Sequence, residues 1–395
     1  MRKATTASVL RLSRSDAIGI AYRARFRSDN PPDAVESAAA QLRSLGYVQI
    51  DTISVVERAH HHVLWSGDRA YRPEFLPALE RAPRRTLEYW AHAAAYLPIE
   101  DYRYCLPRMR RIAETGHQWF PTDPKVVDAV LSRIRAEGPL RSCDFSGGDG
   151  PRGPWWDWKP AKAALEYLFM SGVILVAGRP GFQKLYDLAE RVLPPGVDDR
   201  LPSDDEMADW YARRAACAYG VFCAADAAYQ RKDATAGVGA ALERAAESGS
   251  IVEARLEGDE ARRYWVSADA LERPPSPDDR PVRLLSPFDN YVIDRKRARR
   301  LLGLEYSLEC YVPESKRKFG YFALPVIWRG RPAGLVDAAA DRKRRALVIK
   351  RADLRPRPEE IPGASIDGFR AALGTELRSF AAFNGCDEVV GAPDI

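Results

Sequence analysis

The most regular pattern of apolar and polar residues in this chain occurs twice. The passages AALEYLFMSGVILVAGRPGFQKLYDL and AALERAAESGSIVEARLEGDEARRYWVSAD begin 77 residues apart, at Ala163 and Ala240. Each predicts a helix that ends at a glycine, Gly172 or Gly249, followed by an alternating strand, a glycine-containing turn and a returning strand. Each passage therefore predicts a helix and a β-hairpin.

Two further helical stretches precede each copy, at 124–138 with 139–145 and at 205–220 with 223–231. Three helices and a hairpin form a winged helix-turn-helix unit. Residues 33–51 fit the same template more loosely, with a helix over 33–45, Gly46 and a strand, and predict a third, diverged unit. Winged helices also serve in packing and protein contacts, so this pattern by itself leaves DNA binding open.

Two proline-rich acidic stretches, 193–205 and 271–282, mark boundaries along the chain. We predict an α+β protein with three tandem winged helix-turn-helix units followed by a β-rich C-terminal domain. The predicted domains are 1–120, 121–195, 200–275 and 280–395, and the last one ends in a helix from about 364 to 383.

Composition narrows the class of protein. No run of 18 apolar residues and no secretory signal occurs among the 395 residues, so we expect a cytoplasmic protein with no membrane partner. The six cysteines are scattered without a CxxC pair, which argues against a disulfide framework or a zinc site.

The formal charge is +5, from 60 Lys and Arg against 55 Asp and Glu, and its distribution is more informative than its size. Basic runs lie at 103–111, 294–300, 314–318 and 341–345. Such runs are often solvated faces, but four of them favour a surface that contacts phosphates. The predicted DNA contacts are Arg108, Arg110, Arg111, Lys316, Arg317, Lys318, Arg342 and Lys343.

The segment GYVQID, at 46–51, interrupts an apolar strand with two polar residues. Side chains alternate between the faces of a strand, so Gln49 and Asp51 share one face, with Cα atoms roughly 6.5 to 7 Å apart. A solvent-facing strand or a satisfied polar network has the same spacing. The three adjacent histidines at 60–62 point in different directions and cannot all bind one ion, so we predict no metal.

Four runs of this sequence, LGYVQIDTISVVERAHHHVLWS, LPIEDYRYCLPRMRR, LLSPFDNYVIDRKRARRLLGLEY and ECYVPESKRKFGYFALPV, closely resemble the AlkZ/YcaQ-type winged-helix DNA glycosylases. The resemblance extends from about residue 10 to about residue 385. It implies excision of N7-alkylated guanines and, in some members, unhooking of DNA interstrand crosslinks. The family motif, Gln, an apolar residue, then Gln or Asp, stands here as Gln49-Ile50-Asp51, in the form of the YcaQ subgroup. The resemblance also places His61 and His62 beside the active-site strand, as supporting residues or DNA contacts.

The motif suits this chemistry. An N7-alkylguanine already carries positive charge and leaves C1′ without a general acid, so the enzyme must stabilise an oxocarbenium-like sugar and position a water. Asp51 can offset the cation and accept the proton of the water, while the amide of Gln49 holds that water. Because the motif contains no lysine, we predict hydrolysis without a Schiff base and without strand cleavage. We also predict no cofactor.

Residues 311–322 predict a hairpin with a basic turn, and Trp155, Trp156 and Trp158 predict mainly core packing. The predicted partner is double-stranded DNA with alkylated or crosslinked purines, bound by a monomer at the nucleoid. Two alternatives stay open. A non-catalytic winged-helix regulator would tolerate loss of Asp51, and a protein-interaction scaffold would bind DNA weakly and without dependence on salt.

Overall fold

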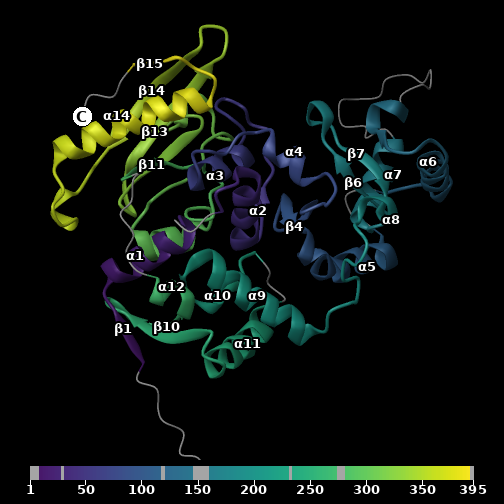
Figure 1. Ribbon diagram of the computed structural model, residues 1–395, viewed down its shortest axis with the longest axis horizontal. Coiled ribbons are helices and arrows are strands. Elements are labelled where there is room, and N and C mark those ends of the chain that lie inside the picture. Colours follow the sequence, from purple (N-terminus) through teal and green to yellow (C-terminus); the bar gives the residue numbers. More distant parts are fainter. Residues whose placement is uncertain are drawn as a thin grey trace, which may run out of the picture. The chain divides into compact units, whose positions relative to one another are not determined.

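The computed structural model of this α+β chain describes residues 9–27, 31–116, 121–145, 160–230, 234–273 and 281–391 (Figure 1). The chain forms two compact units, one from residues 1–72 with 204–395 and one from residues 73–203. These units group the chain differently from the four predicted domains, which stay a prediction. Trp155, Trp156 and Trp158 lie outside the described residues.

The first unit begins with short elements that carry clear end signals. Ser13 and Asp33 cap the helices that follow them, and Gly46 ends the second helix at a φ of 77°. A Cβ atom at Gly46 would lie 2.9 Å from the Arg214 side chain, so a larger residue would also require that side chain to shift. This confirms the predicted helix and its glycine stop. The elements are β1 (Leu10–Leu12), α1 (Arg14–Arg25), α2 (Ala34–Leu45), β2 (Val48–Gln49) and α3 (Ala59–Gly67).

The middle of the first unit is an alanine-rich helical layer on a small sheet. Its strands run in the order β1-β9-β10-β8, with β1 parallel to β9 and the other pairs antiparallel. Small side chains such as Ala212 and Ala241 let the helices approach closely. The elements are α9 (Asp204–Tyr219), β8 (Val221–Phe222), α10 (Ala224–Ala227), α11 (Thr235–Glu247), β9 (Ile251–Leu256), β10 (Asp259–Ser267) and α12 (Ala268–Glu272).

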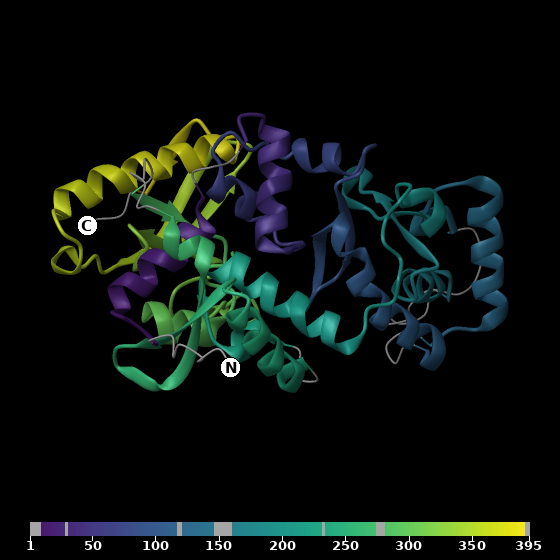
Figure 2. The same cartoon turned by 60° about the horizontal axis from the view of Figure 1, so that its bottom comes forward.

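The C-terminal part of the first unit contains a sheet with the strand order β11-β12-β13-β14-β15. Helix α14 runs along this sheet in both Figure 1 and Figure 2, and Phe369 of the helix packs against Trp328 of β12. This helix confirms the one predicted at about 364 to 383. The elements are β11 (Val282–Leu284), α13 (Arg295–Arg297), η5 (Ala298–Leu302), η6 (Glu314–Lys316), β12 (Ala323–Trp328), β13 (Arg331–Asp341), β14 (Ala346–Leu354), η7 (Pro358–Glu360), α14 (Ile366–Phe383) and β15 (Glu388–Val390).

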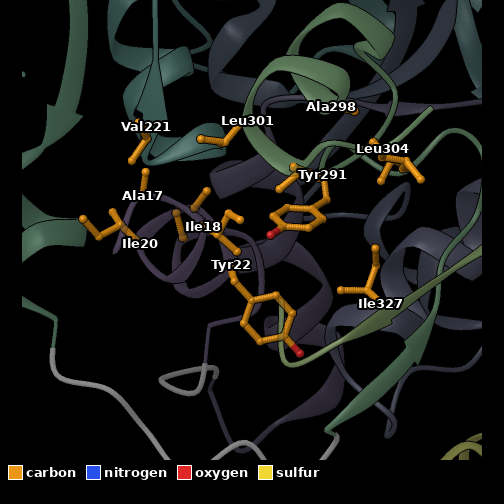
Figure 3. Close-up of a cluster of buried hydrophobic side chains, with 14 of the residues drawn as sticks. Ala17, Ile18, Ile20, Tyr22, Val221, Tyr291, Ala298, Leu301, Leu304 and Ile327 are labelled. Carbon is orange, nitrogen blue, oxygen red and sulfur yellow. The ribbon is translucent and has the colours of Figure 1, made fainter. Parts of the chain in front are cut away.

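One hydrophobic core joins the two ends of the sequence in this unit. Ile18 and Tyr22 of α1 lie in it beside Tyr291, Leu301 and Ile327 from the C-terminal part (Figure 3). The rings of Tyr22 and Tyr291 meet edge to face, with centroids 6.0 Å apart. Burial of this shared apolar surface explains why residues 1–72 associate with 204–395.

The second unit contains a hairpin, β3 with β4, and a sheet of order β5-β7-β6. Tyr89 of β3 donates a hydrogen bond to the Met170 carbonyl at the end of α7. The elements are α4 (Phe75–Leu79), β3 (Thr86–Trp90), β4 (Ala94–Pro98), η1 (Ile99–Cys105), α5 (Leu106–Thr115), α6 (Pro124–Glu137), β5 (Leu140–Arg141), η2 (Ser142–Phe145), α7 (Pro160–Met170), β6 (Ile174–Gly178), η3 (Pro180–Phe182), β7 (Leu185–Leu188) and α8 (Ala189–Val192).

The two sequence repeats form the predicted elements. Helices α7 and α11 are followed by Gly172 and Gly249 at φ values of 78° and 76°, and then by the hairpins β6 with β7 and β9 with β10. The helical prediction for 139–145 was wrong, because Leu140 pairs with Tyr186 as β5 and only a short 3-10 turn follows it there. The Asp144 carboxylate accepts the backbone N–H of Arg141, which favours a turn over a helix.

The predicted hairpin at 311–322 was also wrong. These residues, all within the described structure, form a loop with the short turn η6, and strand β12 begins at Ala323. Their backbone N–H groups bind carboxylates instead of a partner strand: Glu309 accepts from Lys318, Phe319 and Gly320, and Asp337 accepts from Tyr321 and Phe322.

Candidate active site

In the segment that contains Gln49 and Asp51, buried and half-buried side chains alternate. Val48 and Ile50 are buried, whereas Gln49 and Asp51 are half-buried, as the predicted alternation requires. Strand β2 ends at Gln49, earlier than predicted, because the Asp51 carboxylate accepts the backbone N–H of Ile53 at 2.7 Å and starts a turn. Asp51 therefore lies just beyond a strand end, with its backbone fixed by its own side chain.

A buried asparagine holds this segment from the N-terminal side. The Asn290 amide donates to the carbonyls of Leu45 and Tyr47, at 3.3 and 3.4 Å. Asn290 is in the SPFDN run that carried part of the family resemblance. Its position gives that run a structural purpose, which is to orient the backbone that leads to Gln49.

The C-terminal sheet holds the same segment from the other side. The Ala340 N–H on β13 donates to the Val55 carbonyl at 2.7 Å, and Arg342 donates to the carbonyls of Ser54 and Val56, at 2.9 and 3.4 Å. Further along the chain, Asn384 after α14 accepts the N–H of Glu57 at 2.6 Å. Because both ends of the segment are held, Asp51 is placed by the C-terminal sheet as well as by its own strand. The guanidinium of Arg342, predicted to contact DNA, here supports the segment after Asp51.

Burial controls the charge of Asp51. Removal from water raises the pKa of this carboxyl, and the hydrogen bond from the Ile53 backbone partly opposes the shift. The Asp51 charge also reaches the loop after Glu309. The pKa of the Cys310 thiol is raised by burial and then by the negative charge of Asp51.

The two histidines predicted to lie near the site differ in exposure. His61 is half-buried, its Nδ1 lies 2.8 Å from the Tyr71 hydroxyl, and burial and the Arg58 charge lower its pKa to about 4. His62 is 0% exposed, its Nε2 lies 3.0 Å from the Leu284 carbonyl, and its ring packs on Phe380. His62 therefore has no surface to offer to DNA in this structure, and of its two predicted roles the supporting one fits.

The predicted basic contacts divide between the two units. In the first unit, Lys316, Lys318 and Lys343 are exposed, while Arg317 is half-buried and donates to the Val312 carbonyl. In the second unit, all three arginines lie on α5. Arg110 pairs with Glu114, Arg111 is exposed, and the Arg108 guanidinium lies 5.3 Å from the centre of the Trp90 ring.

The basic run at 294–300 is largely internal. Arg297 is buried and donates to the carbonyls of Tyr219 and Val221, and Arg300 binds the Asp226 carboxylate. These charges stabilise the fold, so their presence in a basic run does not identify a DNA surface.

A buried ion pair behind the site was missed by reasoning from the sequence. Arg25 of α1 donates to both oxygens of Asp289 at 2.9 and 2.6 Å, and also to the Val63 carbonyl and the Ser66 hydroxyl of α3. The partners lie 264 residues apart. The one available signal was the polar pair Asp289-Asn290 inside an apolar run, which is typical of residues with buried partners.

The model of one protein family matches residues 42–383, and that family is described as DNA glycosylase AlkZ-like. The match covers the Gln49-Ile50-Asp51 motif, all of the second unit and the C-terminal sheet as far as β14. The chain belongs to the AlkZ-like DNA glycosylase family. As a member, it is a DNA glycosylase of DNA repair that acts on DNA, which favours an enzyme over the regulator and scaffold alternatives.

The solved structure of the Streptomyces sahachiroi DNA glycosylase AlkZ has a similar fold. It superposes with a TM-score of 0.58 at 16% sequence identity, and the match covers 96% of this chain and 99% of that chain. At this identity the likeness supports the fold of this glycosylase and leaves its substrate to other evidence.

Two features are absent from the part of the chain that the structure describes. In that part of the chain, no helix is both long and apolar enough to cross a membrane. Within the same residues, no three His, Cys, Asp or Glu side chains are grouped to hold a metal ion.

Proposed function

We propose that this glycosylase hydrolyses the N-glycosidic bond of N7-alkylated purines and unhooks N7-linked DNA interstrand crosslinks, with Gln49 and Asp51 as its catalytic residues. The observation that carries the proposal is the position and environment of Asp51. It is a half-buried carboxylate just beyond the end of a strand, its backbone is held on both sides, and Gln49, two residues before it, is half-buried as well.

A single carboxylate suits a leaving group that is already cationic. An N7-alkylguanine departs without protonation, so the costly species is the oxocarbenium-like sugar that remains. Partial burial strengthens the attraction between the Asp51 carboxylate and this cation, since the local dielectric is lower than that of water. Asp51 then accepts a proton from the attacking water, and the Gln49 amide orients that water.

The same proposal includes three tandem winged helices. Two segments share one order of elements, α6-β5-η2-α7-β6-β7 and α9-β8-α10-α11-β9-β10, apart from the short turn η3 between β6 and β7. Their strands also share one order across the sheet, β5-β7-β6 and β8-β10-β9. The third segment supports the proposal through its chain order, in which α2, β2 and α3 precede the β3 and β4 hairpin.

We further propose that this monomer binds duplex DNA at the nucleoid through its exposed cations. A crosslinked base is tied to both strands and cannot rotate freely out of the helix, so the lesion is read largely in place, unlike in base-flipping pockets. Each phosphate contact that is lost lowers the slope of log affinity against log salt by about 0.9. Removing Lys316 or Lys343 is expected to do so, and Arg342→Ala is expected to affect the rate as well because Arg342 also supports the active-site segment.

The test is base release from duplex oligonucleotides that contain one N7-methylguanine or one N7-linked crosslink. The wild type should produce abasic sites, and Gln49→Ala and Asp51→Asn should not. Asp367→Asn is the matched control, since this carboxylate is 92% exposed on α14 and its direct ion pair with Arg370, 3.1 Å long, is weak because solvent screens it. If both substrates stay intact while DNA binding persists, the proposal fails and the motif is a structural strand.

The absence of a lysine in the motif makes a second test possible. Borohydride reduction during turnover should trap no covalent complex, and the abasic strand should stay uncut. A trapped complex would replace direct hydrolysis by a Schiff-base mechanism.

A further inference from the structure

The loop at 309–320 exposes the aromatic ring of Tyr311 to solvent. Among the large hydrophobic side chains that the described structure leaves exposed, Tyr311 has the highest exposed fraction, 89%. An isolated aromatic ring in water forgoes the burial of a large apolar surface. Because tyrosine, with an apolar ring and a polar hydroxyl, is enriched at interfaces, such a ring is a candidate for contact with a partner.

The exposure of Tyr311 is not a consequence of a loosely held loop. The buried Glu309 carboxylate accepts three backbone N–H groups, from Lys318 at 3.0 Å, Phe319 at 2.8 Å and Gly320 at 3.3 Å. The Glu309 carbonyl accepts the Val312 N–H at 2.9 Å. Tyr311 therefore lies between two anchored residues, and its backbone is fixed while its ring points into solvent.

Strand β13 connects this loop to the active-site segment. Its Asp337 carboxylate accepts the N–H groups of Tyr321 and Phe322, at 3.1 and 3.3 Å, where the loop ends. Three residues further along the same strand, the Ala340 N–H donates to Val55. One strand therefore positions both the Tyr311 loop and the residues that follow Asp51.

The electrostatics agree with this placement. The pKa of the Tyr311 phenol is raised by the adjacent Cys310, then by partial burial and then by the Asp51 charge. Asp51 also acts on the Cys310 thiol. The phenol consequently stays protonated at neutral pH, and what it offers a partner is its ring and a neutral hydroxyl.

The surroundings of the ring favour nucleic acid over protein as the partner. Lys316 and Lys318 of the same loop are exposed, so one anchored loop carries both cations for phosphates and a ring for bases. An exposed ring beside cations is the combination that binds unstacked nucleotides, because each base has a π-face. We propose that Tyr311 stacks on a nucleobase next to the lesion, within DNA bound over Asp51, and so orients the lesion's sugar toward the carboxylate.

This inference rests on the proposed function, and its test separates the two. A duplex with 2-aminopurine beside a tetrahydrofuran abasic analogue reports stacking without any catalysis. Wild type and Tyr311→Phe should change the 2-aminopurine fluorescence equally on binding, and Tyr311→Ala should not. Equal signals from all three proteins overturn the proposal, even if the enzyme proves inactive on N7-alkylpurines.

Kinetics provide the second measurement. Tyr311→Ala should lower kcat/KM for base release by roughly 5- to 150-fold, the range that loss of one stacked base implies. Tyr311→Phe should stay close to the wild type. Lys316→Ala is the matched control from the same loop: it should reduce the salt dependence of binding, whereas Tyr311→Ala should leave that dependence unchanged. A Tyr311→Ala protein with wild-type kcat/KM overturns the proposal, and so does an equal loss in Tyr311→Phe.

Discussion

Two opposed effects act on the pKa of the Asp51 carboxyl. Burial raises its pKa, and the hydrogen bond from the Ile53 backbone N–H lowers it by a smaller amount. Between the ordinary Asp pKa of about 3.9 and the raised value, the folded protein binds more protons than the unfolded chain. Stability attributable to Asp51 therefore falls as the pH rises through this window, while the carboxylate needed for catalysis becomes available.

This linkage predicts the pH profile of base release. The rate should rise with pH through one ionisation whose pKa lies above that of an exposed Asp, measured as single-turnover rates at constant ionic strength. Asp51→Asn should lose roughly 10²- to 10⁴-fold in rate and the acid limb with it. Its Tm at pH 7 should equal or exceed that of the wild type, because a neutral amide costs less to bury. A variant within a few-fold of wild-type activity would refute the assignment.

For His61 we predict that a substitution has no effect on the salt dependence of DNA binding. With a pKa lowered to about 4, its imidazole is neutral throughout the range from pH 6 to 8. His61→Gln should therefore leave the salt dependence of DNA binding unchanged in that range, as measured by fluorescence anisotropy across a salt series. A slope reduced by about one unit would mean that His61 is a cation facing phosphate.

At the scale of elements, the active-site segment is a short strand held by residues from other parts of the chain. Asn290→Ala removes the donors to the Leu45 and Tyr47 carbonyls. We expect a loss of about 1 to 2 kcal/mol in stability and a lower kcat, with little change in DNA affinity. Single-turnover rates and anisotropy separate these effects.

The control for this prediction is Thr375→Ala, which removes an exposed hydroxyl hydrogen bond on α14. It should leave both rate and affinity near those of the wild type. If Asn290→Ala changed affinity and left kcat intact, the asparagine would affect DNA binding more than the position of Asp51.

At the scale of the whole molecule, the Arg25 and Asp289 pair ties the beginning of the chain to its C-terminal part. Both side chains are almost fully buried, at 1% and 0% exposure. Asp289→Ala leaves an uncompensated buried guanidinium and should cost about 3 to 5 kcal/mol. Urea denaturation of this variant measures the loss.

A double variant tests whether the two residues act as a pair. Arg25→Met with Asp289→Ala should be less destabilised than the sum of the single changes, since neither charge is then left alone. Additive losses would show that each residue contributes separately to packing.

Much of the local structure follows from the sequence by itself. The glycine stops at Gly46, Gly172 and Gly249 were predicted correctly, and so was the alternation that exposes Gln49 and Asp51. These features depend on residues within about four positions of each other, through caps, left-handed glycines and the two-residue period of a strand. The family resemblance, also a property of the sequence, is confirmed by the family match.

Only the tertiary structure decided which polar residues have distant partners. The predicted strands at 311–322 failed because the carboxylates of Glu309 and Asp337 accept the backbone N–H groups of this segment. Arg297, which belongs to a basic run of the sequence, is buried in the core. Asp289 pairs with Arg25, 264 residues away in the sequence. Such contacts leave no periodic pattern along the chain, because one hydrogen bond between distant residues constrains neither residue's neighbours. The packing of α1 against the C-terminal part brings those partners together, and packing is a property of the folded chain.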